Sequence, residues 1–335
     1  MSVSFIIPLF NCLPLTQAML ASLRATLPAG LASEIIFVDD GSTDGTRAWL
    51  ETLRGDPSIR IVLHERNLGY AAANNHGAAL ATGELLVLLN NDLLLTPRWL
   101  EPMLAVHRAL GASAGLVGNL QSDVATRALD HAGIAINHQG KPEHIRQRSI
   151  FSRLLRFSRQ EVVAVTGACV LVRRELWTQL GGFDEAFVNG CEDVDLCLRA
   201  RAAGFVNAVA NHSIVLHHVS SSPGRKLRDE ANTRRLVQHW RETLVPLGAR
   251  AWCRHHLATF LRDPRDFPDQ TVARQAFFHA LHLRRDPPTA ALVGIVVNID
   301  IENARWEKML PEPNWPRESS FHVMPPASAL RSFPA

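Results

Sequence analysis

The stretch Leu85-Leu86-Val87-Leu88-Leu89-Asn90-Asn91-Asp92 decides the fold, because an unbroken apolar run ends abruptly in two amides and a carboxylate. A run of about five apolar residues is far too short to span a membrane and is typical of a central parallel strand covered on both faces. Ligands of open α/β sheets bind just beyond the carboxyl ends of such strands. We therefore expect Asp92 to lie in a functional crevice.

Length and composition are those of a globular protein with one large domain and an extension. The chain has 335 residues, of which 47% are hydrophobic and 20% are charged. A formal net charge of +3 is too small to favour nucleic acid as a partner. The five cysteines are odd in number and lack paired metal spacing, which favours free thiols in a reducing cytosol. We therefore expect a cytoplasmic protein.

Neither of the two long apolar stretches predicts a membrane anchor. Residues 3–23 lack a basic leader and are broken by Pro8, Asn11 and Pro14, unlike a signal peptide. Residues 290–297 fall far short of the roughly 20 residues that a spanning helix needs. The sequence therefore predicts no transmembrane segment.

Short apolar strands alternate with helical patterns in the first part of the chain. We expect strands at residues 3–9, 34–38, 60–63 and 85–89, and helices at residues 15–25, 46–53 and 70–81. This alternation is the βαβ rhythm of a parallel sheet. Thr96 followed by Pro97 predicts the N-cap and first turn of another helix, which reaches about residue 108.

The second part of the chain extends the sheet and then changes in composition. We expect strands at residues 115–120, 162–172 and 205–215, and helices at residues 174–180, 194–203, 226–244 and 273–284. Between the first two strands, residues 121–160 alternate poorly and are rich in His, Arg and Gln, which suits an irregular surface excursion near a site. Asp195 and Arg199 are four residues apart on a helix and predict a surface ion pair.

The stretch Asp39-Asp40-Gly41-Ser42-Thr43-Asp44 follows a strand and opens a helix. Backbone amides at a helix start suit a nucleotide, although an N-cap and turn would use the same residue types. The turn after the first strand, Leu9-Phe10-Asn11-Cys12, contains no glycine, so the dinucleotide fingerprint of a dehydrogenase is missing.

Asp92 is either a turn residue or part of a charged site. Like charges about 4 Å apart at a protein surface repel by roughly 4 kcal/mol, so acids near a nucleotide diphosphate imply a cation. A hard Mg²⁺ or Mn²⁺ meets that need and stabilises charge on a leaving diphosphate. His217 and His218 end a later strand, either as surface side chains or as one further metal ligand.

The stretch Cys191-Glu192-Asp193-Val194-Asp195 places three carboxylates at a helix start. Capping would account for one or two of these acids. Asp193 is also the type of group that can take a proton from an attacking hydroxyl. We interpret Asp193 as a catalytic base.

With these stretches in order, the chain resembles the inverting glycosyltransferases of family 2, in particular their rhamnosyltransferase-like branch. The resemblance covers roughly residues 2–222 and rests on Ile7-Pro8-Leu9-Phe10-Asn11, Val38-Asp39-Asp40-Gly41-Ser42-Thr43-Asp44, Asn67-Leu68-Gly69-Tyr70, Leu89-Asn90-Asn91-Asp92, Gly181-Gly182-Phe183-Asp184-Glu185 and Glu192-Asp193-Val194-Asp195-Leu196-Cys197-Leu198-Arg199. It implies an α/β protein of the GT-A fold, with a single Rossmann-like, mostly parallel sheet flanked by helices. A mainly helical C-terminal extension follows.

The resemblance also implies roles for individual residues. The catalytic residues would be Asp193 and Glu192, and the nucleotide-sugar contacts would be Pro8, Asp39, Asp40, Asn67, Asn91 and Asp92, with Asp40 on the base. Asp92 and His217 would bind Mg²⁺ or Mn²⁺. Asn90 stands where many relatives carry a first Asp, so Asp92 is the one carboxylate of this strand end that can hold the metal.

The expected domains are a GT-A glycosyltransferase domain at residues 1–222, a helical extension at 223–310 and a proline-rich tail at 311–335. Within the first, the nucleotide-sugar half would span about residues 1–110 and the acceptor half about residues 111–222. The expected partners are a nucleoside-diphosphate sugar and a glycan or lipid-linked acceptor in surface-polysaccharide assembly, with rhamnose among the candidate sugars. The amphipathic extension suits packing, dimerisation or peripheral contact with the inner face of a membrane.

Two other functions stay open from the sequence. An inactive nucleotide-sugar-binding scaffold would keep the pocket without turnover, and donor hydrolysis with Mn²⁺ would separate it from an enzyme. A sugar nucleotidyltransferase shares this sheet type and should carry a glycine-rich, basic first loop. Residues 9–15 contain no Gly, Lys or Arg, which disfavours the nucleotidyltransferase.

Overall fold

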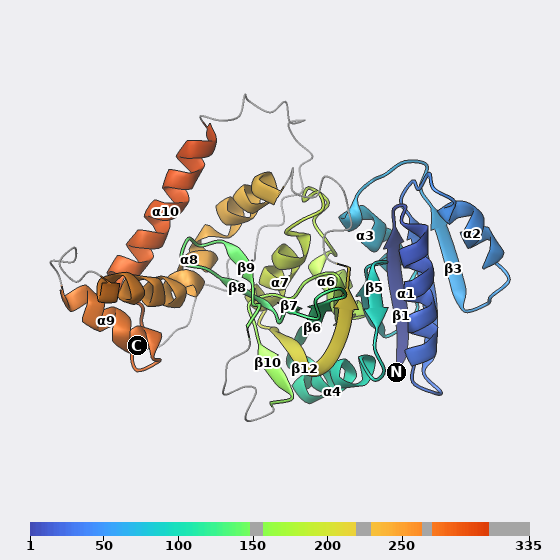
Figure 1. Ribbon diagram of the computed structural model, residues 1–335, viewed down its shortest axis with the longest axis horizontal. Coiled ribbons are helices and arrows are strands. Elements are labelled where there is room, and N and C mark those ends of the chain that lie inside the picture. Colours follow the sequence, from blue (N-terminus) through green and yellow to red (C-terminus); the bar gives the residue numbers. More distant parts are fainter. Residues whose placement is uncertain (148–156, 219–228, 263–269, 308–335) are drawn as a thin grey trace. The chain divides into compact units, whose positions relative to one another are not determined.

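The computed structural model describes residues 1–147, 157–218, 229–262 and 270–307, of which 229 and 301–307 are described by their backbone alone (Figure 1). The chain divides into two compact units, Met1–Ile299 and Asp300–Ala335. All the predicted site residues belong to the first unit. The predicted domain edge at residue 222 and the tail at residues 311–335 lie outside the described residues.

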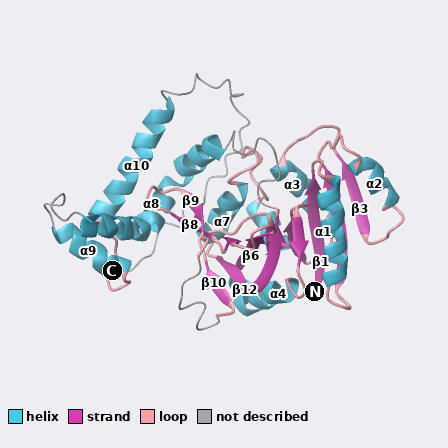
Figure 2. Cartoon of the chain, viewed as in Figure 1, coloured by secondary structure: helices cyan, strands magenta, loops and turns pink. Residues whose placement is uncertain are grey.

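A ten-stranded mixed sheet forms the centre of the first unit (Figure 2). Its main path runs β10 (Arg159–Glu161), β12 (Val206–His217), β6 (Ala114–Asp123), β11 (Cys169–Arg173), β4 (Leu85–Leu89), β1 (Ser2–Leu9), β2 (Ala32–Asp39) and β3 (Ile59–Leu63). Off this path, β5 (Leu93–Leu95) pairs with β12 and β7 (Leu129–His131) pairs with β6. A separate pair consists of β8 (Ile134–Ile136) and β9 (Pro142–His144).

The first four strands form the parallel part of the sheet that the sequence predicts. β1 pairs in parallel with β2 and β4, and β2 pairs in parallel with β3. Every residue of β4 is buried, as expected for a strand covered on both faces. The carboxyl ends of these strands therefore meet at one edge of the sheet, directly before Asp40 and Asn90.

Helices cover both faces of the sheet because successive strand residues point to opposite sides. In β1, Phe5 and Ile7 belong to one buried cluster and Ile6 to the other. The first cluster includes α1 (Leu13–Thr26), α2 (Thr46–Thr52) and α4 (Leu100–Leu110), and the second includes α3 (Tyr70–Leu80), α6 (Arg174–Leu180) and α7 (Glu192–Ala202). A short 3₁₀ turn, η1 (Gly111–Ser113), follows α4.

The helical extension consists of α8 (Asp229–Arg262), α9 (Gln270–Ala280) and α10 (Thr289–Glu307). Leu236 and Val237 of α8 lie in the same buried cluster as α7. Nearby, Asn232 Nδ2 donates to Val188 O at 2.8 Å. The first part of α8 is thus packed against the part of the sheet domain that carries α7.

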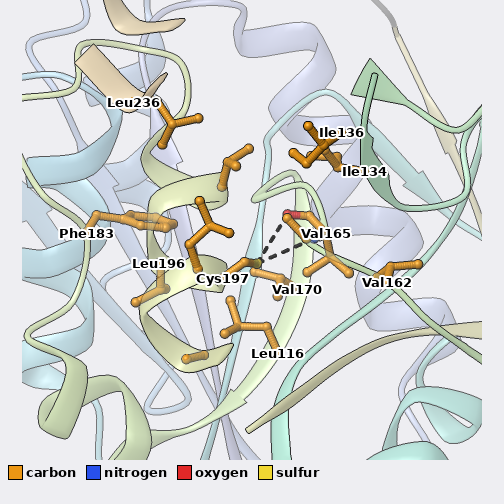
Figure 3. Close-up of a cluster of buried hydrophobic side chains, with 14 of the residues drawn as sticks. Leu116, Ile134, Ile136, Val162, Val165, Val170, Phe183, Leu196, Cys197 and Leu236 are labelled. Carbon is orange, nitrogen blue, oxygen red and sulfur yellow. Dashed lines mark hydrogen bonds between the residues drawn. The ribbon is translucent and has the colours of Figure 1, made fainter. Parts of the chain in front are cut away.

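A buried cluster beside α7 fills the space between the sheet, α8 and β8, as Figure 3 shows for Cys197, Val165, Leu236 and Ile134. The Cys197 thiol accepts the Val165 amide at 3.4 Å and donates to Val165 O at 3.8 Å. Burial raises the pKa of this thiol, so Cys197 stays protonated and packs as an apolar group.

Several predicted element boundaries are wrong, and in the extension the helix expected at residues 226–244 continues to Arg262 as α8. The helix expected to start at Thr96 starts at Leu100, because Thr96 Oγ1 donates instead to Ile214 O at 2.6 Å and Arg98 takes a left-handed φ of 62°. The strand expected at residues 162–172 is formed only from Cys169 onward. Residues 162–168 leave the main ladder and carry contacts of the candidate site.

The predicted surface pair of Asp195 and Arg199 is also wrong, because the pair is inside the protein. The two side chains are 5% and 23% exposed, and Arg199 Nε donates to Asp195 Oδ2 at 2.8 Å. Trp240 Nε1 of α8 donates to the other Asp195 oxygen at 2.8 Å. The extension covers the pair, which spacing along a helix does not reveal.

No helix in the described part of the chain combines the length and the apolar composition that crossing a membrane requires.

Candidate active site

The predicted nucleotide residues follow β1 and β2 at the carboxyl edge of the sheet. Pro8 is buried in β1 opposite Val38 of β2. Asp39 ends β2 with a fully buried side chain, and Arg47 Nε donates to its Oδ2 at 2.8 Å. Asp39 Oδ1 has no hydrogen-bond partner among the residues that the structure describes. An arginine of α2 thus fixes the orientation of this carboxylate.

Asp40 holds the loop that leads into α3. Its Oδ2 accepts the Gly69 amide and its Oδ1 accepts the Leu68 amide, each at 2.8 Å. His64 Nδ1 donates to Oδ1 at 2.8 Å, and His64 Nε2 lies 2.9 Å from Nδ1 of the exposed His76. Protein donors therefore engage both Asp40 oxygens, and the predicted contact of Asp40 with a base stays a prediction.

Gly41 allows this loop to lie against the end of β2. Its φ is +82°, and a Cβ there would lie 2.7 Å from the Arg66 carbonyl carbon and 2.7 Å from the Asn67 nitrogen. Only glycine fits both the left-handed conformation and the close approach. Asn67 has an exposed side chain in this loop. The structure thus places Asn67 beside the strand end that carries Asp39 and Asp40.

Asn91 ties the end of β4 to the turn after β1. Its Nδ2 donates to Thr16 Oγ1 at 3.0 Å and to Asn11 O at 3.4 Å. Asn11 Oδ1 in turn accepts the Thr43 amide at 2.8 Å. The ends of β1, β2 and β4 are therefore joined to one another, as expected from the parallel pairing.

Asp92 lies beside His217, the last residue of β12. The Asp92 Oδ1 and His217 Nε2 atoms are 3.3 Å apart, and the two side chains are 13% and 8% exposed. The His218 amide donates to Asp92 O at 3.0 Å. β12 pairs with β5 so that His217 is opposite Leu93. The fold therefore brings the two predicted metal ligands together from positions far apart in the sequence.

These residues fit a divalent cation that is shared with a ligand. Carboxylate and imidazole groups are ligands that Mn²⁺ accepts, and Mg²⁺ or Mn²⁺ at phosphate sites takes further oxygens from the substrate. His217 Nδ1 and Asn90 Oδ1 are buried and have no hydrogen-bond partner within the described residues. That part of the chain contains no group of three or more His, Cys, Asp or Glu side chains able to hold a metal. A cation at this edge would need ligand oxygens.

Asp193 lies in the first turn of α7, where backbone amides hold its carboxylate. The Gly167 amide donates to Oδ2 at 2.7 Å, and the Val194 amide donates to Oδ1 at 2.8 Å. The residue is half-buried. Because each carboxylate oxygen has two lone-pair sites, both oxygens keep capacity for a further hydrogen bond. The arrangement leaves Asp193 able to accept a proton from a hydroxyl.

The other acids of this turn support the start of α7. Glu192 is 5% exposed, and its Oε2 accepts the Gly190 amide at 2.6 Å. Asp195 is 4% exposed and is engaged by Arg199 and Trp240. Of the three neighbouring carboxylates, Asp193 is therefore the one with substantial exposure.

The segment Thr166-Gly167-Ala168, which we term the bridging segment, connects the strand ends to α7. The Asn90 amide donates to Ala168 O at 2.8 Å. Tyr70 Oη donates to Gly167 O at 2.8 Å, while the Gly167 amide is held by Asp193. A Cβ on Gly167 would lie 3.0 Å from Tyr70 Oη and 3.4 Å from Asp193 Cβ. The segment therefore fits closely between α3 and α7.

Tyr70, the one tyrosine in the sequence, joins α3 to the loop before α7. Its amide donates to Asn189 Oδ1 at 3.1 Å, and its ring centroid is 5.8 Å from that of Phe183. The loop that leads to Asp193 thus contacts the start of α3, directly after the Asp40 loop.

His131, from the excursion at residues 121–160, is buried behind the bridging segment. The Thr166 amide donates to His131 Nε2 at 3.4 Å, and His131 Nδ1 lies 3.3 Å from His144 Nδ1. Burial, together with the nearby His144 and His217 rings, lowers the pKa of His131 well below its ordinary value. The excursion therefore supplies a neutral imidazole next to the site.

The sequence alone did not point to the bridging segment or His131, and Tyr70 entered only as part of a motif. One signal was available, because an isolated glycine inside an apolar strand pattern, such as Gly167, indicates a close approach of the backbone. His131 carries no comparable signal, since its partner Thr166 is 35 residues away in the sequence.

Residues 4–181 match the model of the family described as Glycosyl transferase family 2. The matched range runs from β1 through β11 and α6 and includes Asp39, Asp40, Asp92 and the bridging segment.

Two relatives match over a longer range. The chain is 30% identical over 272 residues to the N-acetylglucosaminyl-diphospho-decaprenol L-rhamnosyltransferase of Mycobacterium tuberculosis, covering 74% of this chain and 85% of that protein. It is 32% identical over 222 residues to the O-antigen biosynthesis protein RfbC of Myxococcus xanthus, covering 64% of this chain and 17% of that protein. The chain spans 30% and 17% of the length of two of the curated relatives that it matches.

A solved structure shares the fold. The crystal structure of GalNAc-T7 with UDP, GalNAc and Mn²⁺ superposes with a TM-score of 0.60 at 16% sequence identity, covering 85% of this chain and 55% of that one. This likeness, together with the mostly parallel sheet and its flanking helices, confirms the predicted GT-A fold.

Proposed function

The chain belongs to glycosyl transferase family 2, and on that premise we propose that it moves a sugar from a nucleoside diphosphate to an acceptor hydroxyl, with inversion and with a divalent cation. One observation carries the proposal. The bridging segment bonds to the Asp193 carboxylate through the Gly167 amide and, through Ala168 O, to the amide of Asn90. Asn90 stands two residues before Asp92, which lies beside His217.

In the proposed reaction, Asp193 accepts the proton of the acceptor hydroxyl while that oxygen attacks the anomeric carbon. The new carbon–oxygen bond forms as the bond to the diphosphate breaks, and the nucleoside diphosphate leaves with the bonding electrons. A direct displacement of this kind inverts the configuration at the anomeric carbon. The half-buried position of Asp193 holds the base and limits its contact with water.

For the cation we propose Asp92 and His217 as protein ligands, with Mg²⁺ or Mn²⁺ as the ion. When bound, it would neutralise charge on the diphosphate oxygens. The Asp92 and His217 side chains, 13% and 8% exposed, supply an oxygen and a nitrogen 3.3 Å apart, which supports a shared site. The relative structure named above was solved with UDP and Mn²⁺, which agrees with this assignment.

For the nucleotide we propose the surface formed by the ends of β1, β2 and β4. Pro8 and Asn91 would shape this surface, and Asp39 and Asp40 would form one side of it. Asn67 would contact the nucleotide from the exposed loop. Glu192 would support the turn before Asp193 through its bond to Gly190.

For the substrates we propose a nucleoside-diphosphate sugar and a glycan or lipid-linked acceptor in surface-polysaccharide assembly. A relative is named as a rhamnosyltransferase acting on a diphospho-decaprenol sugar, and another as an O-antigen biosynthesis protein. Rhamnose is therefore the first sugar to test, with UDP-, dTDP- and GDP-sugars compared by thermal shift because a bound donor stabilises the folded state.

The helical extension presents an apolar face for which we propose an anionic lipid surface as partner. Phe277 and Phe278 of α9 are 48% and 42% exposed, and Leu281, directly after the helix, is 53% exposed. Arg274 is also exposed, while Ala273 and Ala276 are buried. Leu283 is 69% exposed and precedes Arg284 and Arg285. Exposed Phe and Leu flanked by arginines suit the boundary between acyl chains and anionic headgroups.

Replacing Asp193 by Asn should lower donor turnover by about 10²- to 10⁴-fold and leave donor affinity within about twofold, because only the proton acceptor is lost. Turnover is measured as nucleoside diphosphate released from the sugar nucleotide that gives the largest thermal shift. Asp56→Asn, at a surface turn, is the matched control and should behave as wild type. Unchanged turnover in Asp193→Asn would remove Asp193 from the mechanism, and absence of turnover in wild type would favour the scaffold.

Replacing Asp92 by Ala, or His217 by Gln, should weaken Mn²⁺-dependent donor binding by about tenfold or more, because each variant removes one ligand of the ion. Calorimetric titration of the donor is run with Mn²⁺ and with EDTA. His212→Gln, exposed on the same strand β12, is the control. Equal donor affinity with and without Mn²⁺, in wild type and variants alike, would refute the metal assignment.

The double variant Phe277→Ser, Leu281→Ser should lose about tenfold or more in affinity for vesicles containing phosphatidylglycerol, because membrane affinity scales with buried apolar area. Co-sedimentation of the full chain is the measurement, with pure phosphatidylcholine vesicles and Leu80→Ser of α3 as controls. A wild-type chain that does not sediment with the anionic vesicles contradicts this contact. The contact is also contradicted if the wild-type chain forms a concentration-dependent dimer and the double variant does not.

A further inference from the structure

We propose that His131 is a positioning residue for Asp193, acting through the backbone of Thr166 and Gly167. The inference rests on the proposed role of Asp193 as the base. It assigns a function to the part of the excursion that forms β7. The last residue of β7 is the buried His131.

Two consecutive amides connect the imidazole to the carboxylate. The Thr166 amide donates to His131 Nε2 at 3.4 Å, and the next amide, of Gly167, donates to Asp193 Oδ2 at 2.7 Å. The two amides belong to adjacent planar peptide units that are joined at the Thr166 Cα, so only the φ and ψ dihedrals of Thr166 separate the first amide from the second. His131 thus acts on the donor that holds the carboxylate, without touching the carboxylate itself.

Within the described part of the chain, the other hydrogen bonds of the bridging segment do not involve the Thr166 amide. Tyr70 Oη bonds to Gly167 O and the Asn90 amide bonds to Ala168 O, so both hold carbonyl groups. The Ala168 amide donates to Thr166 Oγ1 at 3.4 Å, within the segment. His131 is the side chain from outside the segment that receives the Thr166 amide.

The surroundings of His131 keep it in the form that this role needs. Since Nε2 accepts a hydrogen bond, the ring proton lies on Nδ1, which faces His144 Nδ1 at 3.3 Å. The side chain is 0% exposed, and burial with the rings of His144 and His217 lowers the pKa of His131, so the neutral acceptor persists.

An imidazole at this place is poorly explained by packing alone. Burying a polar ring is costly unless it is hydrogen-bonded, and an aliphatic side chain would fill the same space more favourably. The bond that His131 makes goes to the segment beside the base. The backbone at Gly167 is tightly packed, since a Cβ there would lie 3.0 Å from Tyr70 Oη. We therefore expect a small shift of the bridging segment to move the Asp193 carboxylate.

Two substitutions separate positioning from packing. His131→Leu keeps the volume and removes the acceptor, whereas His131→Gln can place a side-chain oxygen near the position of Nε2. We expect His131→Leu to lower kcat for donor turnover by about 10- to 100-fold with KM for the donor within about twofold, because misplacing a catalytic group costs rate rather than binding. His131→Gln should recover most of that loss.

A double variant shows whether the effect runs through Asp193. Adding His131→Leu to Asp193→Asn should change kcat by less than about twofold, because residues that act as one unit are non-additive. If the losses in kcat of the two single variants multiply in the double variant, the inference is overturned. Equal losses in His131→Leu and His131→Gln, or a kcat unchanged in His131→Leu, would also overturn it.

Control variants separate a failure of the positioning role of His131 from a failure of the proposed function. His279→Leu removes another buried histidine, in α9, and should leave kcat unchanged. Thermal unfolding of each variant verifies that the protein is folded at the assay temperature. If Asp193→Asn itself has no effect, the proposed function fails. If Asp193→Asn is slow and His131→Leu is as fast as wild type, the positioning role alone fails.

Discussion

The hydrogen bond from the Gly167 amide to the Asp193 carboxylate, 2.7 Å long, is the contact on which the candidate site depends. It holds together parts of the chain that the sheet topology alone would leave separate. The nucleotide side comes from the parallel strands β1, β2 and β4, whereas Asp193 comes from α7, beyond the antiparallel β11. The bridging segment crosses from one to the other, and its lack of a side chain at Gly167 is what lets α3 and α7 approach it together.

Much of the fold followed from local chemistry. Short apolar runs with polar ends predicted β1 to β4 closely, because a strand buried on both faces needs an uninterrupted apolar sequence. Parallel pairing then brings Asp39, Asn91 and Asp92 to one edge without further information. The errors have a common cause: Thr96, residues 162–168 and Asp195 are each determined by partners distant in sequence, namely Ile214, the site contacts of the bridging segment, and Trp240. The spacing of apolar residues along the sequence carries no information about those partners.

The same limit applies to the site. Asp92, His217 and Asp193 could be predicted as site residues because carboxylates and histidines at element ends carry a chemical signal of their own. Tyr70 and His131 form hydrogen bonds with backbone groups, and a backbone donor or acceptor leaves no trace in composition or spacing. The extension also has a place in this scheme, since Trp240 bonds to Asp195 two residues beyond Asp193 and so braces the helix that carries the proposed base. Asp193 and Trp240 both lie beyond the matched family range, which ends at residue 181.

The central claim is that one carboxylate, held between the bridging segment and α7, activates an acceptor for direct displacement at the anomeric carbon. The anomeric configuration of the first-formed product tests this claim most directly. It is read by NMR from the one-bond coupling between the anomeric carbon and its proton, which differs between the two anomers of rhamnose as well, using the nucleotide sugar that the protein binds and Mn²⁺. Direct displacement predicts a product whose anomeric configuration is opposite to that of the donor. A product that retains the donor configuration would contradict it.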